Sequence, residues 1–353
     1  LGVFGSDGFG AELVAIEAEH SGTRKETHAF REMPYPALTV LLRFGGRNLA
    51  EVLATRQVEV MLVDPYRRAQ AELAGVEVPV AANFTSGYGL WLARSDFASQ
   101  SLRSLFGASN GLARPTVYLM QPYDPNRRVI VMLHGLASSP EAWINVANEV
   151  LGDEELRRHY QIWQVYYPTN APIALNHRAI QQALQETFQH FDPQGQAAAS
   201  HHVTLIGHSM GGVLSRLLVS HADAQVADGF LSELALTPER QAQLRQQLKP
   251  YLEFAPLPGV DRAIFIAAPH RGTSFANLRL ARWLSNPITL PAAMLGQLGD
   301  LALSLGQAQS SSGEETHVQR IPNSIDNLSD RDPFIRLTAD LPIDPAVRYH
   351  SII

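Results

Sequence analysis

The sequence predicts an α/β protein with a doubly wound, mostly parallel sheet, preceded by a smaller β-rich module. From about residue 115, short apolar runs alternate with segments whose apolar residues recur every three or four positions. This is the pattern of parallel strands joined by helices. Before that point, short β-branched runs are separated by turn-forming residues, and helical periodicity is weak. We therefore expect the module over residues 1–112 and the α/β domain over residues 113–353.

The composition excludes several classes of protein. A chain of 353 residues is long enough for one large domain and a small module. Its net charge of −6 makes a nucleic-acid partner unexpected, because such a partner needs a basic face. The chain has no cysteine, so it cannot form a disulfide, a thiolate nucleophile or a cysteine-ligated metal site. No apolar run reaches the length of a membrane-spanning helix.

Local patterns place the individual elements. Residues 129–133 form a continuous apolar run, which is typical of a strand buried on both faces of a parallel sheet. In the module, strands are expected at residues 38–42, 58–63 and 76–80, followed by a linker over about residues 97–114. The other strands expected in the domain cover residues 162–167, 203–206, 263–267 and 347–353, and the helices cover residues 140–159, the stretch from Ile180 to Phe191 and the segment after Gly212.

The strongest functional motif is Gly207-His208-Ser209-Met210-Gly211, which matches G-x-S-x-G. A buried strand precedes it and an apolar-faced helix follows it, so the motif occupies a sharp strand-to-helix turn. Such a turn has no room for bulky neighbours and lifts the serine hydroxyl out at the carboxyl end of the sheet. The helix N-terminus beside it favours a developing negative charge. We therefore expect Ser209 to be a nucleophile, with Gly207 and Gly211 as supporting residues.

A second element, His134-Gly135-Leu136, follows the strand at residues 129–133. In a fold with a nucleophile turn of this kind, the loop here supplies the other oxyanion donor. The expected donors are the backbone N–H groups of Leu136 and Met210, and Gly135 lets the backbone approach the substrate.

The histidines near these motifs are expected to support the site rather than move protons. His134 is expected to pack beside the site, and His208 is expected to point away from the nucleophile. His270 follows the strand at residues 263–267 and would be an alternative base. We do not expect that role, because no acid lies on a suitable strand end between Ser209 and His270.

Three segments together resemble bacterial lipase- and esterase-like α/β-hydrolases: VMLHGLASSP at residues 131–140, GHSMGG at residues 207–212 and APHRG at residues 268–272. They are similar to the GPI inositol-deacylase-like hydrolase family. The resemblance covers about residues 115–353 and is specific for the superfamily rather than for a substrate. It implies the α/β-hydrolase fold, with Ser209 as nucleophile. Bacterial relatives with an N-terminal β-rich segment look like envelope proteins, so the resemblance implies the cell envelope or periplasm.

The reaction expected is the hydrolysis of a carboxylic ester through an acyl-enzyme on Ser209, with no metal and no cofactor. A lid-like insertion is expected over about residues 271–330. Its apolar stretch at residues 283–298 favours small-molecule or lipid esters with apolar acyl groups, and makes a membrane surface a candidate partner. The oligomeric state is open. The alternatives are an acyltransferase or thioesterase on the same fold, and a non-catalytic binding module.

The catalytic acid and base are expected beyond Ile353. In this fold the triad follows the order serine, acid, histidine, and the acid comes after the second strand beyond the serine. That strand is residues 347–353, and the first residue of the chain is not methionine, which also indicates a cut sequence. Asp344 and His350 are too close in sequence to end two successive strands. The other aspartates precede the strand, at the end opposite Ser209: Asp326, Asp330 and Asp332.

Overall fold

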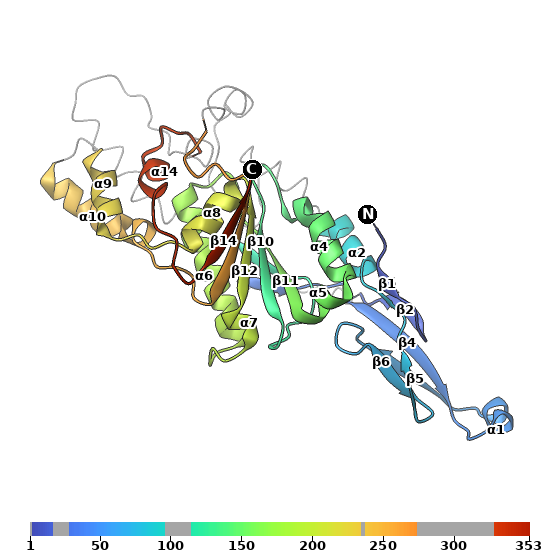
Figure 1. The fold of residues 1–353 in the computed structure, drawn as a ribbon. Coiled ribbons are helices and arrows are strands. Elements are labelled where there is room, and N and C mark those ends of the chain that lie inside the picture. The colour runs from blue at the N-terminus through green and yellow to red at the C-terminus, as the bar shows by residue number, and fades with distance from the viewer. Residues whose placement is uncertain (1, 17–27, 96–113, 234–236, 274–327) are drawn as a thin grey trace.

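The computed structural model describes residues 2–16, 28–95, 114–233, 237–273 and 328–353. Within these ranges no helix is both long and apolar enough to cross a membrane. Figure 1 shows a body built around one large sheet and a narrow β-arm that projects from it.

The body contains a seven-stranded sheet in the order β14-β13-β12-β10-β11-β9-β3. The strands from β14 to β11 are mutually parallel, and β9 runs antiparallel to β11. The predicted doubly wound, mostly parallel sheet is therefore confirmed. The strands are β3 Phe30–Glu32, β9 Thr116–Leu119, β10 Arg128–Leu133, β11 Tyr160–Tyr166, β12 Val203–His208, β13 Val260–Ile266 and β14 Arg348–Ile352.

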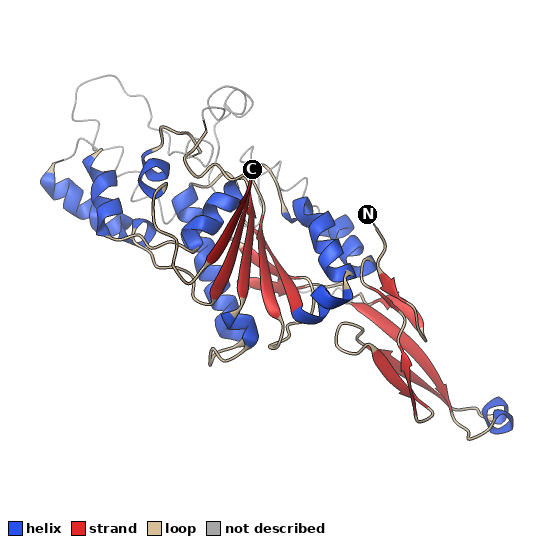
Figure 2. Ribbon diagram, viewed as in Figure 1, coloured by secondary structure: helices blue, strands red, loops and turns tan. Residues whose placement is uncertain are grey.

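Helices cover both faces of this sheet (Figure 2). One face packs against α6 (Ile173–Phe191) and α8 (Met210–Leu218), and α9 (Ala224–Ser232) and α10 (Pro238–Leu252) extend this layer. The other face packs against α2 (Ser86–Ser95) and α4 (Ile144–Gly152). The shorter helices are the 3-10 helix Pro140–Trp143, α5 Glu154–His159, α7 Ala198–His201 and α14 Pro333–Thr338.

Strand β10 shows why a continuous apolar run forms here. Val129, Val131 and Leu133 belong to the core on the α6 and α8 side. Ile130 and Met132 belong to the core on the α4 side. Successive side chains of a strand point to opposite faces, so a strand covered on both faces needs apolar residues at every position.

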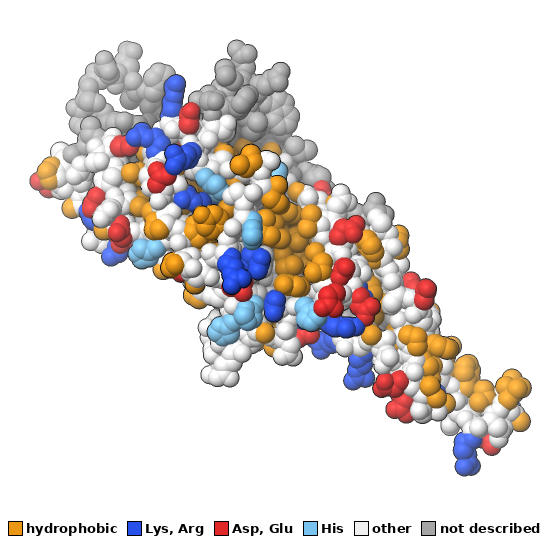
Figure 3. Space-filling view, viewed as in Figure 1, with side chains coloured by type: hydrophobic (Ala, Val, Ile, Leu, Met, Phe, Trp, Pro, Cys, Tyr) orange, Lys and Arg blue, Asp and Glu red, His pale blue; other side chains and the backbone are white. Residues whose placement is uncertain are grey.

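The sheet is less covered toward its β14 edge. Ile206, Ile264 and Ile266 are only partly buried, and β14 is exposed along its whole length. Figure 3 shows hydrophobic side chains gathered on this side of the body, between β14 and α4.

The arm consists of β2 (Ala11–Val14), β4 (Ala37–Phe44), β5 (Val58–Val63) and, at its tip, α1 (Leu49–Ala54). The strands form an antiparallel sheet in the order β2-β4-β5. Next to it lie two small two-stranded sheets: β6 Gln70–Leu73 with β7 Val76–Pro79, and β1 Gly5–Ser6 with β8 Ala82–Asn83. The three strands predicted in this region are confirmed as β4, β5 and β7.

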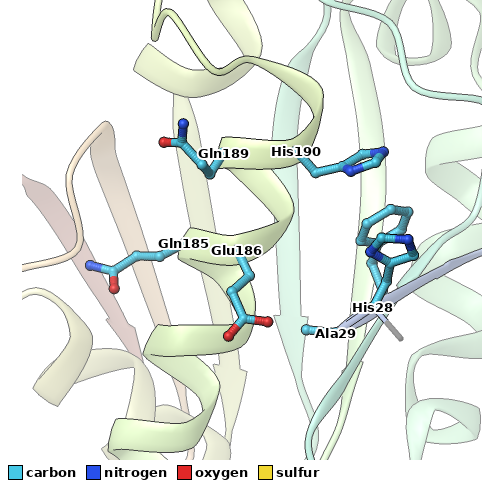
Figure 4. Close-up of a pocket in the computed structure, with 7 residues that line it drawn as sticks. His28, Ala29, Gln185, Glu186, Gln189 and His190 are labelled. Carbon is cyan, nitrogen blue, oxygen red and sulfur yellow. The ribbon is translucent and has the colours of Figure 1, made fainter. Parts of the chain in front are cut away.

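The N-terminal region also reaches into the body. Strand β3 pairs with β9, with Phe30 opposite Val117. A shallow pocket of about 510 Å³ lies where the chain before β3 meets α6, and His28 and His190 line it, with ring centroids 5.1 Å apart (Figure 4). The predicted linker and lid-like insertion fall almost wholly outside the described residues, so the domain limits stay a prediction.

One prediction about helices was wrong, and one helix was not predicted. Residues 140–159 do not form one helix: Asp153 ends α4 and its side chain accepts a hydrogen bond from the Leu156 N–H at the start of α5. A capping aspartate starts a new helix in this way, and three or four residue spacing alone cannot reveal the break. The region before residue 112 also contains a buried helix, α2, whose Tyr88 and Trp91 pack into the core on the α4 side.

Candidate active site

The site lies where the connections from two adjacent strands diverge. Strands β10 and β12 are neighbours, and Leu133 pairs with Gly207, so both strands end at the same level. After β10 the chain forms β11, which lies beside β10 on one side. It then crosses the sheet to form β12, which lies beside β10 on the other side. Such a switch point opens a crevice beyond the carboxyl ends of the strands, where ligands bind in open α/β sheets.

Ser209 occupies the turn between β12 and α8 in a strained conformation. Its φ is 54° and its ψ is −121°, a left-handed region that a residue with a side chain rarely adopts. Such a residue costs about 1–3 kcal/mol and persists only where its surroundings hold it. Here the Ser209 N–H donates to Ile266 O at 2.9 Å, and its carbonyl accepts from the Gly212 N–H at 2.9 Å. The turn is tied to β13 on one side and to α8 on the other, and Ser209 stays partly exposed.

Glycines allow this close packing. A Cβ atom on Gly207 would lie 2.2 Å from the Gly211 carbonyl oxygen, and a Cβ atom on Gly211 would lie 2.2 Å from the Leu133 carbonyl oxygen. Both oxygens belong to the backbone and cannot move aside, so α8 approaches β10 only because these positions lack side chains. A Cβ atom on Gly135 would lie 3.1 Å from the Ser209 Cβ atom, which places the loop after β10 directly beside the serine.

Two backbone N–H groups near the serine donate to no acceptor in the part of the chain that the structure describes. Met210 is the first residue of α8, so its N–H has no carbonyl one turn back within the helix. Leu136 lies in the turn after β10 and is followed by Ala137 at a φ of 54°. Within the described ranges neither N–H donates to an acceptor. Free N–H groups at a helix start and an adjacent turn are suited to holding a negatively charged oxygen.

His134 is buried beneath this loop. Its Nδ1 lies 3.0 Å from the Gly135 carbonyl oxygen, and its ring stacks on Tyr167 with centroids 4.3 Å apart. The Tyr167 hydroxyl donates a hydrogen bond to the His134 carbonyl oxygen. Burial lowers the pKa of His134 to about 4, with the Gly135 carbonyl opposing the shift, so the imidazole is neutral near pH 7. Sequence reasoning missed Tyr167, whose only signal is its position just after β11, the neighbour of β10.

The other two histidines lie elsewhere around the crevice. His208 is the exposed last residue of β12, and its Nδ1 is 3.2 Å from where a Cβ atom on Gly135 would lie. His270 packs edge-to-face on Phe265, with centroids 5.0 Å apart, and lines a cavity of about 340 Å³ that Arg216 of α8 also lines. Burial, followed by the charge of Arg216, lowers the pKa of His270 to about 4.

The structure separates Asp344 and His350 from Ser209. Asp344 precedes β14, at the amino end of the sheet, and accepts a hydrogen bond from the Ala346 N–H at 2.8 Å. His350 is exposed in the middle of β14, opposite Ile264. The expectation that Asp330 lies at the opposite end of the sheet was wrong: its backbone adjoins Gly272, which follows the carboxyl end of β13. Asp332 caps α14, while Asp326 lies outside the described residues. In the part of the chain that the structure describes, no hydrogen bond joins the Ser209 side chain to a histidine.

The described residues contain no cluster of three or more histidine, aspartate or glutamate side chains that could hold a metal ion. The pocket in Figure 4 brings two histidines and Glu186 near one another, but does not form such a cluster.

A sequence profile of the Alpha/beta hydrolase family matches residues 130–350. The match covers more than half of the chain, and the chain belongs to this family. The turn that holds the strained Ser209 lies within the matched segment, whereas β3 and β9 of the sheet lie outside it.

Solved structures give distant likenesses. The mature form of a Bacillus licheniformis lipase is 17% identical with a TM-score of 0.34, and the match covers 69% of this chain and 72% of the lipase. A native esterase of Thermogutta terrifontis is 17% identical with a TM-score of 0.28, and the match covers 53% of this chain and 64% of the esterase. None of the curated proteins compared with this chain matches it. At these values nothing about this chain's substrate follows from the likenesses.

Proposed function

We propose that this chain is a serine hydrolase that cleaves carboxylic esters, with Ser209 as its nucleophile. One observation carries the proposal. Ser209 is held at a φ of 54° at the end of β12, and the segments on either side of it carry the N–H groups of Leu136 and Met210, which donate to no acceptor among the described residues. Backbone strain is maintained where it serves a function, and a strained serine beside free donors is suited to acyl transfer.

The proposed reaction has two steps. The Ser209 Oγ attacks the acyl carbon, its proton passes to a base, and the N–H groups of Leu136 and Met210 hold the negative oxygen. The tetrahedral intermediate expels the alcohol, which takes up the proton. Water then attacks the acyl-enzyme in the same way and releases the acid. The chain order of the triad in this fold puts the acid and base after β14, and this remains a prediction.

The proposed substrates are small-molecule or lipid esters with an apolar acyl group. Support comes from family membership and from the apolar composition of residues 283–298. Similarity to GPI inositol-deacylase-like hydrolases and a place in the cell envelope or periplasm belong to the same proposal, on the motif resemblance alone. A membrane surface as partner is proposed on the apolar stretch at residues 283–298.

The test is labelling of the full-length protein with a fluorophosphonate probe. Labelling should occur at Ser209, and Ser209→Ala should abolish it and lower ester turnover by about three orders of magnitude or more. Ser351→Ala is the matched control, because Ser351 is an exposed serine near the carboxyl end of β14. Its labelling and turnover should be unchanged. Labelling at another serine, or near-normal turnover of Ser209→Ala, would overturn the assignment.

The same preparation separates the alternatives. An acyltransferase would pass the acyl group to an added alcohol in preference to water, and a thioesterase would prefer thioester substrates. A non-catalytic binding module would neither react with the probe nor turn over any ester.

A further inference from the structure

The arm has an apolar face that is open to solvent. The register of β4 and β5 places Val40 opposite Leu62, Leu42 opposite Val60 and Phe44 opposite Val58. Side chains two residues apart share a face, so these pairs form one continuous surface. On the same side, Leu13 of β2 pairs with Leu38. We call this the outer face of the arm, and no charged residue interrupts it: Ala11, Leu13, Leu38, Val40, Leu42, Phe44, Val58, Val60 and Leu62.

The outer face is exposed to solvent although it is apolar. The outer face leaves Leu42 54% exposed, Val60 59% and Leu62 66%. The inner face carries the exposed ion pair Arg43–Glu59 near the tip. Closer to the body, Leu41 and Val63 are buried with Val80, and Ala71 and Leu73 of β6 pack against them. An antiparallel sheet with one open side normally presents polar residues there. Figure 3 shows hydrophobic side chains along the arm.

The helix at the tip is a second, independent observation. α1 has six residues, none of them buried, and Leu49 and Leu53 are 73% and 77% exposed. A helix this short is not stable on its own in water, and helices in proteins are held mainly by packing of an apolar face. The apolar side chains of α1 are therefore available to pack against another surface.

We propose that the outer face of the arm binds a second copy of this chain, with the two arms packed face to face about a two-fold axis. This interface is independent of the proposed function. In a two-fold arrangement with antiparallel arms, the tip of each arm meets the base of the other. Leu49 and Leu53 of α1 would then pack near Leu13 of the second copy, at the base of its outer face.

The size and chemistry of the face favour a second copy. Its side chains expose on the order of 500 Å² together, so two such faces would bury at most about 1,000 Å², at the lower limit of specific interfaces. An uncharged, apolar sheet face matches another of its kind, and sheets pack face to face in this way in sandwich folds. A two-fold interface uses the same patch on both copies, so one exposed face is sufficient.

The position of the arm argues against a lipid surface. Figure 1 shows that the tip of the arm lies far from the end of the sheet at which β14 terminates, and Ser209 lies at that end. A membrane that held the arm would not bring lipid to the candidate active site.

The experiment measures the mass of the full-length protein by sedimentation equilibrium over a range of concentrations. We expect a dimer that Leu42→Glu with Val60→Glu converts to monomer, with the dissociation constant raised about 30-fold or more. Val146→Glu is the matched control: Val146 is an apolar residue of α4 that is 42% exposed, and its variant should stay dimeric. Val60→Thr keeps a residue of high β propensity at this position, so the arm should still fold. It should weaken the dimer less than the glutamate variants, and this distinguishes a loss of association from a loss of folding.

Three outcomes would overturn the proposal. The protein could be monomeric at every concentration, or the arm variants could dimerise as tightly as the control. The third is binding to vesicles of phosphatidylglycerol and phosphatidylcholine that the arm variants abolish, which would assign the face to lipid. Fluorophosphonate labelling of Ser209 should be the same in all the variants, so a failure here is distinct from a failure of the proposed function.

Discussion

The strand before Ser209 and the strands of the arm look alike in sequence but differ in their surroundings. In β12, Val203 and Leu205 are fully buried against the helices on the α6 and α8 side. In the arm, Leu42, Val60 and Leu62 lie on a single face and are more than half exposed. Apolar residues with strand spacing thus predict a strand and the residues that share its face. Whether anything covers that face is decided by the tertiary structure.

The largest expected change in stability comes from truncating one leucine in each of the two regions. Leu205→Ala should lower the free energy of unfolding by about 2–5 kcal/mol, because it leaves a cavity in the core. Leu62→Ala removes the same atoms from a side chain that is 66% exposed, and should cost less than about 0.5 kcal/mol. Urea unfolding of dilute protein, where association does not contribute, measures both. Equal losses would mean that the outer face is covered within one chain.

The pH dependence of stability should also differ between the body and the arm. The body holds two buried histidines, His134 and His177, and burial lowers the pKa of His134 to about 4 and that of His177 to about 3. The unfolded chain binds protons at these histidines near pH 6.5 whereas the folded chain does not, so their neutral state favours folding above pH 6.5. The folded state loses this contribution as the pH falls from about 6.5 toward 4. The loss in the free energy of unfolding is on the order of 3 kcal/mol for each histidine.

The test of this titration removes one buried histidine. His177→Gln should flatten the fall in unfolding free energy between about pH 6.5 and 4, because burial lowers the pKa of His177. The strands and helix of the arm contain no histidine, so no histidine of these elements contributes to the slope. A slope that is the same in His177→Gln and in the unchanged protein would show that His177 is not held neutral by burial.

The parts of the fold that could be predicted are those where local chemistry and tertiary structure agree. Residues 129–133 are apolar at every position because both faces of β10 are buried. The turn at Ser209 was predictable because its glycines meet steric demands that a sequence shows directly: a Cβ atom on Gly211 would strike the Leu133 carbonyl. The order of these motifs along the chain was then enough to predict a doubly wound sheet.

The parts that could not be predicted depend on contacts between distant segments. Tyr167 holds the His134 carbonyl only because β11 lies next to β10. Strand β3 joins the main sheet by pairing with β9, where Phe30 lies opposite Val117, a residue more than eighty positions further along the chain. The break at Asp153 is set by one side-chain hydrogen bond to the Leu156 N–H. Periodicity carries no information about such pairings.

The smallest effect concerns the ion pair on the inner face of the arm. Arg43 and Glu59 lie opposite one another on β4 and β5 and form an ion pair with side chains 51% and 54% exposed. Exposed pairs of this kind contribute about 0.2–1 kcal/mol, and salt screens them. A double-mutant cycle with Arg43→Ala and Glu59→Ala should give a coupling energy in this range in dilute buffer, and less at about 1 M salt.

This measurement also sharpens the comparison between the arm and the body. In the body, Arg157 donates to the Leu151 and Gly152 carbonyls at 2.8 and 3.0 Å, and its guanidinium lies 3.6 Å over the Phe84 ring. Arg157→Ala removes hydrogen bonds and packing together, so its cost should exceed the Arg43–Glu59 coupling and change little with salt. A coupling of several kcal/mol in the arm would instead mean that the pair is shielded from water. The inner face would then be an interface as well, and the assignment of association to the outer face alone would fail.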